Sequence, residues 1–135
     1  GRLRVQVLPF VSQEDYDRLL WSCDFNAVRG EDSFVRALWA GKPLLWHIYQ
    51  QADDAHLHKL EAFVQLYLQG LSDESAQALR TFWQAWNTGE PLALSWQALH
   101  AQWPQVQRHA RNWSIRQAAH RDLAAGLAHF CANWL

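Results

Sequence analysis

The sequence predicts an α/β domain in which a short parallel sheet of about three strands is followed by a helix-rich remainder. Residues 25–28 and 43–48 are apolar runs of strand length, residues 3–7 alternate apolar and polar side chains, and a loop follows each of the three segments. A helix start signal follows each loop, and such alternation of strands and helices is typical of a parallel sheet. From residue 54 onward the apolar residues recur at helical spacing, so we expect only helices there.

In the first predicted strand, residues 3–7, apolar side chains alternate with polar ones. This period of two is typical of a strand with one buried face. Ser12 then stands where a helix N-cap is expected, and Asp15 follows three residues later as in a capping box. If this strand is a parallel neighbour of the second one, Phe10 and Gln13 lie at the carboxyl edge of the sheet.

The second predicted strand, residues 25–28, has the β-branched and aromatic character of a short buried strand. We expect Gly30 to release the chain into a turn that bulkier residues would resist. Asp32 or Ser33 can cap the helix that follows, and Gly41 is expected to end it in the left-handed conformation.

The third predicted strand, residues 43–48, is followed by Tyr49 and Gln50, which can line the same edge of the sheet or merely open the next helix. Further helices are expected near residues 54–70, 72–89, 91–103, 104–118 and 121–133. Six of the nine tryptophans fall in the back half of the chain, where large rings are expected to fill gaps between helices.

The composition indicates one domain, because 135 residues with half of them hydrophobic can bury a single core, and we expect this domain to be cytoplasmic because it has only two cysteines. The net charge is −1 with acidic and basic residues interspersed, so nothing indicates the basic face that electrostatic binding to nucleic acid requires. Cys23 and Cys131 are too few for a disulfide scaffold, so reduced thiols are expected. No apolar run reaches the roughly 20 residues of a bilayer span, and the histidines have no zinc-binding spacing.

The turn after the second strand is the best candidate for an anion site, because amides at a helix start attract anions. Arg29 and Ser33 would then bind a diphosphate, Glu31 would accept hydrogen bonds from sugar hydroxyls, and the Asp32 side chain would fold back onto helix amides. The alternative left open by the pattern is that Asp32 is an ordinary cap and Arg29 pairs with Glu31 at the surface.

These residues also carry a resemblance to a known family. They form the run Arg29-Gly30-Glu31-Asp32-Ser33-Phe34, with Cys23-Asp24 before it and Ala40-Gly41-Lys42-Pro43 and Trp46-His47-Ile48-Tyr49-Gln50 after it. With them, and with Leu8-Pro9-Phe10-Val11-Ser12-Gln13 upstream, the sequence resembles the carboxyl-terminal part of the EarP family. That family comprises protein-arginine rhamnosyltransferases that modify translation elongation factor P.

The resemblance implies a Rossmann-like carboxyl-terminal half of an inverting GT-B glycosyltransferase that uses dTDP-β-L-rhamnose without a metal or other cofactor. It implies that Phe10 and Gln13 contact the thymine nucleotide and that Glu31 is needed for activity, while Arg29, Asp32 and Ser33 complete the expected donor-binding set. The catalytic base would lie in an amino-terminal half, so residues 1–135 are expected to be a donor-binding fragment that is inactive alone.

Two other functions remain open from the residues themselves. The first is another GT-B nucleotide-sugar transferase, which would keep the turn at residues 29–33 but select another base or sugar. The second is a non-enzymatic helical interaction module, which the tryptophan-rich back half suggests. Separately from these functions, the pattern alone leaves open that Phe10 is a plain core residue.

Overall fold

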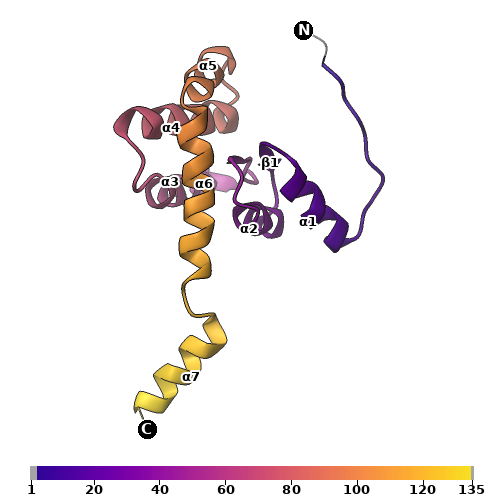
Figure 1. The fold of residues 1–135 in the computed structure, drawn as a ribbon. Helices are drawn as coiled ribbons and strands as arrows, with labels where there is room; N and C mark the ends of the chain where they lie inside the picture. The colour runs from indigo at the N-terminus through magenta and orange to yellow at the C-terminus, as the bar shows by residue number, and fades with distance from the viewer. Residues whose placement is uncertain (1–2, 135) are drawn as a thin grey trace.

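The computed structural model describes residues 3–134, so Gly1 and Arg2, where the predicted domain starts, and Leu135 lie outside the described residues. A small sheet lies in the amino-terminal third, and helices make up the remainder (Figure 1). In chain order the elements are α1 (Gln13–Ser22), β1 (Asn26–Val28), α2 (Glu31–Trp39), β2 (Leu44–Trp46), the short 3-10 helix η1 (Ala52–Asp54), α3 (Ala55–Tyr67), α4 (Asp73–Thr88), α5 (Ala93–Ala101), α6 (Trp103–Ala118) and α7 (Leu123–Trp134).

The sheet among the described residues has two strands, so the prediction of about three strands is wrong. β1 and β2 pair in parallel, as predicted, with Asn26 opposite Leu44 and Val28 opposite Trp46. Both strands are shorter than the apolar runs that predicted them. The α/β class is therefore confirmed, with a smaller sheet than expected.

The missing strand is the alternating segment at residues 3–7, which is extended but pairs with no described strand. Leu3, Val5 and Val7 are 79 to 90% exposed, and the segment runs outside the packed helices (Figure 1). Alternation makes a segment suitable for a sheet, but a strand forms only where a neighbour supplies its backbone hydrogen bonds. None of the described residues supplies them to this segment.

The helix boundaries follow the predicted caps in several places. The Ser12 hydroxyl accepts a hydrogen bond from the Asp15 amide at 3.2 Å, which confirms the cap of α1. Gly41, just after α2, and Gly89, at the end of α4, have φ angles of 64° and 76°, in the left-handed region that favours glycine. Asp54 precedes α3 as predicted, but its side chain makes no capping hydrogen bond.

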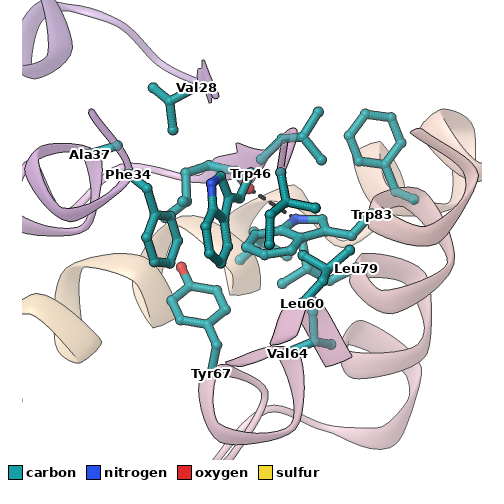
Figure 2. Packing of buried hydrophobic residues seen from close by; sticks show 14 of the residues in the cluster. Val28, Phe34, Ala37, Trp46, Leu60, Val64, Tyr67, Leu79 and Trp83 are labelled. Carbon is teal, nitrogen blue, oxygen red and sulfur yellow. Dashed lines mark hydrogen bonds between the residues drawn. The ribbon is translucent and has the colours of Figure 1, made fainter. Parts of the chain in front are cut away.

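The core lies where α3 and α4 pack against β2, and large aromatic rings fill it (Figure 2). Phe34 stacks on Trp46 with ring centroids 4.1 Å apart, and Phe63 lies parallel to Trp83 at 5.8 Å. The indole Nε1 of Trp83 donates a hydrogen bond to the Leu44 carbonyl oxygen at 3.0 Å. The prediction that tryptophans fill the space between elements is confirmed for these residues, because burying such rings contributes much of the hydrophobic stabilisation.

The last helix, α7, extends past the end of α6 and away from the other helices (Figure 1). Leu123, Leu127 and Phe130 on this helix are 56 to 88% exposed. Cys23 and Cys131 are both free and exposed. Among residues 3–134, no helix has the length and apolar character needed to cross a membrane.

Candidate functional site

The turn between β1 and α2 is fastened to β2 by two hydrogen bonds. The Val28 carbonyl oxygen accepts from the His47 amide at 2.8 Å, and the Arg29 carbonyl oxygen accepts from the Trp46 indole at 2.9 Å. Trp46 is 2% exposed, so a buried side chain holds the backbone at the point where the predicted anion site begins. The parallel strands β1 and β2 and the aromatic core that packs against β2 therefore hold this turn in place.

Gly30 is the N-cap of α2, with φ −71° and ψ 155°, and no side chain caps the helix. This backbone conformation is open to any residue, so the expectation that Gly30 is needed for a strained turn is wrong. The expected cap by Asp32 or Ser33 is also wrong, because the helix already begins at Glu31. The amides of the first helical turn lack the carbonyl partners that later helix amides have, and such a helix start favours an anion.

The Asp32 carboxylate turns along α2 instead of back onto the helix amides, which corrects the predicted arrangement. Its Oδ2 accepts a hydrogen bond from Arg36 Nε at 2.8 Å. Arg36 also donates from Nη1 to both carboxylate oxygens of Asp17, at 3.0 and 2.9 Å. Arg36 therefore joins α1 to α2 and draws the negative charge of Asp32 away from the free amides.

An open groove of about 480 Å³ lies between the segment before α1 and the start of α2. Four of the six predicted site residues line it, namely Phe10, Gln13, Asp32 and Ser33. Their convergence does not come from paired strands, as expected, but from the packing of α1 against α2. The Phe10 ring is fully exposed, so it is not a core residue here and one of its faces is free for stacking.

Arg29 and Glu31 do not line this groove, and each has a partner on another element. The Arg29 guanidinium lies over the Tyr49 ring, 4.8 Å from its centroid. The Glu31 carboxylate accepts a hydrogen bond from Lys59 Nζ of α3 at 3.1 Å. This pairing replaces the surface pair between Arg29 and Glu31 that the sequence left open.

Lys59 also affects the pKa of the Glu31 carboxyl. Its hydrogen bond, helped by the backbone amide of Glu31 itself, lowers the pKa of the Glu31 carboxyl below its ordinary value. Glu31 is therefore an anion at neutral pH, and its carboxylate has lone pairs left over to accept hydrogen bonds from hydroxyl groups.

The sequence interpretation missed Lys59 and the indole nitrogen of Trp46. Lys59 comes 28 residues after Glu31 and looks like an ordinary solvent-facing helix residue, so no local pattern links the two. Tyr49, which the sequence predicts could line the same edge, lies beside Arg29 and Gly30 but does not line the groove.

Residues 3–134 contain no group of three or more histidine, cysteine, aspartate and glutamate side chains placed to hold a metal ion. Two histidines instead have structural hydrogen bonds. His56 Nδ1 accepts from the Gln51 amide at 3.2 Å, and His109 Nε2 donates to the Tyr67 carbonyl oxygen at 2.6 Å.

A family model described as Elongation-Factor P (EF-P) rhamnosyltransferase EarP matches residues 1–132. The chain belongs to the EarP family. The resemblance drawn from the turn at residues 29–33 and its flanks is thereby confirmed, and it extends over the exposed segment before α1 and over α7. The helices of the back half are therefore part of this family's domain.

Curated EarP relatives named protein-arginine rhamnosyltransferase occur in Pseudomonas putida and Pseudomonas aeruginosa. Each is 61% identical to this chain, over 135 and 133 residues respectively. A solved structure described as the structural basis for EarP-mediated arginine glycosylation of translation elongation factor EF-P is 58% identical, covers 96% of this chain and has a TM-score of 0.83. The chain covers only 36% and 35% of the two relatives and 41% of the solved chain.

Proposed function

We propose that residues 1–135 are the donor-binding portion of a longer, cytoplasmic protein-arginine rhamnosyltransferase of the GT-B type. The enzyme would transfer L-rhamnose, with inversion, from dTDP-β-L-rhamnose to an arginine side chain of translation elongation factor P. The observation that carries this proposal is the groove at the start of α2, where Phe10, Gln13 and Ser33 meet beside uncapped helix amides in a chain of the EarP family.

The base of the nucleotide fits the amino-terminal wall of the groove. The exposed Phe10 ring can stack on thymine, and the Gln13 amide, at the first residue of α1, can donate to and accept from its edge. Neither contact requires a rearrangement of the core, because both side chains are exposed.

The diphosphate fits the start of α2. The Ser33 hydroxyl and the first-turn amides can donate to phosphate oxygens. Arg29, which directly precedes the N-cap residue Gly30, can donate to them as well. As the glycosidic bond breaks, negative charge develops on the diphosphate leaving group, and these fixed donors would stabilise it. We propose that this set of donors takes the place of a metal ion.

Glu31 is proposed to hold the donor sugar or ribose through their hydroxyl groups, and it is not the base. The arginine acceptor has a pKa above about 12, so a second carboxylate must orient it and help remove its proton. We propose that this carboxylate belongs to the amino-terminal half of the enzyme, outside this chain. The 135-residue chain alone is then expected to transfer no rhamnose.

The test is a calorimetric titration of the longer transferase with dTDP-β-L-rhamnose, with Phe10→Ala and Arg29→Ala variants. Each substitution is expected to weaken binding by about 1 to 3 kcal/mol, because it removes a stacked base or a charged hydrogen bond. Val7→Ala is the matched control for Phe10, since Val7 is 90% exposed in the same segment but does not line the groove. Arg18→Ala is the matched control for loss of a positive charge.

Unchanged affinity in both site variants, or no binding at all, would contradict the donor site. Tighter binding of a UDP-sugar than of dTDP-β-L-rhamnose would instead indicate another nucleotide-sugar transferase of the same fold.

A further inference from the structure

Lys59 of α3 is the one charged partner that the described structure gives to Glu31. Its Nζ lies 3.1 Å from Glu31 Oε1, and the two side chains are 50% and 57% exposed. An ion pair as exposed as this one contributes little to folding stability. Folding stability therefore does not explain why Lys59 pairs with Glu31, and we consider a role in orienting Glu31 instead.

A second contact restricts where the Lys59 side chain can lie. Its ammonium group sits over the Trp46 ring, 5.3 Å from the centroid, in a cation–π contact. Trp46 is buried, stacks on Phe34 and donates its indole hydrogen bond to the Arg29 carbonyl oxygen. The same indole therefore supports both the backbone of the turn and the cation that binds Glu31.

The other charged groups of the turn are engaged elsewhere. Arg29 lies over Tyr49, and Asp32 is bound by Arg36. Lys59 contacts one carboxylate oxygen of Glu31, Oε1, and an ionised carboxylate has about four lone-pair sites, so the group can still accept hydrogen bonds from a ligand. The arrangement fixes the direction of the carboxylate without covering it.

We propose that Lys59 is a positioning residue, which holds the Glu31 carboxylate in the orientation that receives the hydroxyl groups of the donor. This inference rests on the proposed function, since it takes Glu31 to contact the donor. Lys59 acts through Glu31 and makes no bond to the donor itself. Orientation of a bound sugar affects the rate of transfer more than affinity, because the base and diphosphate contacts stay in place.

The experiment compares Lys59→Ala and Lys59→Arg in the longer transferase, with dTDP-β-L-rhamnose as donor and translation elongation factor P as acceptor. Lys59→Ala is expected to lower kcat about tenfold and to change KM for the donor less than about threefold. Lys59→Arg, which keeps the charge and can donate to the same oxygen, is expected to restore most of kcat. The thermal unfolding midpoint should stay unchanged in both variants. Lys42→Ala is the matched control, because it removes a lysine that does not contact Glu31.

A double-mutant cycle separates this inference from the proposed function. In a Glu31→Gln background, Lys59→Ala should lower kcat/KM less than about twofold further, because coupled residues are not additive. If Lys59→Ala costs the same in both backgrounds, or costs nothing while Glu31→Gln is impaired, the positioning role is wrong and the donor site stands. If Glu31→Gln itself keeps full activity, the proposed role of Glu31 in the site is wrong.

Discussion

The turn at residues 29–33 and the segment at residues 3–11 carry the two sides of the proposed donor site, and the protein holds them in different ways. The turn follows a parallel strand and is fastened by the buried indole of Trp46. The segment is extended, pairs with no described strand and presents Phe10 fully exposed. One wall of the groove is thus set by the core, and the other depends on the packing of α1 alone.

This difference shows that a binding site can be preorganised on one side only. The free energy for holding the turn comes from burial of aromatic rings beneath it. The Phe10 side chain is free to change rotamer in the unbound protein, so a ligand must restrict it on binding. Substitutions in the core should therefore change folding stability, whereas substitutions in the exposed segment should change ligand affinity.

Among the substitutions that test this difference between core and exposed segment, Trp83→Ala is expected to change folding stability the most. Trp83 is 1% exposed and donates a hydrogen bond to Leu44. Its removal is expected to lower the free energy of unfolding by about 3 to 5 kcal/mol, through lost burial and the cavity left behind. Urea unfolding followed by far-UV circular dichroism measures this change. Phe10→Ala is the matched aromatic control and should change stability by less than about 0.5 kcal/mol. Similar losses in the two variants would contradict the comparison.

Asn87→Ala should have an intermediate effect, because Asn87 extends the hydrogen bonding of β2 beyond its last strand residue. Its Oδ1 accepts from the Ile48 amide at 3.1 Å, and its Nδ2 donates to the carbonyl oxygens of Trp46 and Trp83 at 3.0 and 2.9 Å. We expect a loss of about 2 kcal/mol in the free energy of unfolding, since the substitution takes these side-chain partners from the Ile48 amide and the Trp46 carbonyl, whereas the Trp83 carbonyl keeps its helical hydrogen bond.

Urea unfolding measures the Asn87→Ala loss, with Gln77→Ala on the same helix as control. Gln77 makes one exposed hydrogen bond to Thr81, so its removal should be close to neutral. An equal loss in the free energy of unfolding in both variants would show that the hydrogen bonds from Asn87 to the backbone around β2 do not stabilise the fold.

The smallest expected effect is a pH dependence that His109 adds to stability. Burial, and secondarily the nearby Arg116, lower the pKa of His109 below its ordinary value, against the opposing effect of its hydrogen bond to Tyr67. As the pH falls below about 6.5, the unfolded chain takes up a proton that the folded protein resists, so stability is lost. His109→Gln should make the free energy of unfolding depend less steeply on pH between about 7 and about 5.5.

Gln107→Asn, at an exposed position on the same helix, is the control for this pH series, because it changes a side chain that has no titratable group. A slope that is the same with and without His109 would show that its proton binding does not differ between the folded and unfolded states.

The local signals of the sequence were enough for most elements. Ser12 marks the start of α1, Gly41 and Gly89 mark helix ends, and the short apolar runs became β1 and β2. The turn at residues 29–33 was also recognisable, because its residues stand next to one another in the chain. These features depend on a few neighbouring residues, so a local pattern contains the information.

The failures came where a residue depends on a distant one. Residues 3–7 have the pattern of a strand, but the described chain supplies no neighbour to pair with them. The capping roles given to Asp32 and Ser33 failed because α2 already begins at Glu31, and Arg36, anchored by Asp17 of α1, binds the Asp32 carboxylate. Lys59 could not be linked to Glu31 because nothing near either residue indicates the other.

The sequence by itself determined the family, the α/β class, the helix ends and the identity of the candidate residues, since short-range propensity and adjacent side chains specify these. Only the tertiary structure decided which of the candidates meet in one groove, and which partner each charge takes. The pairing of Glu31 with Lys59 and of Arg29 with Tyr49 arises because packing brings α3 and the end of β2 beside the turn. Such contacts follow from the burial of the aromatic core, which is a property of the whole chain.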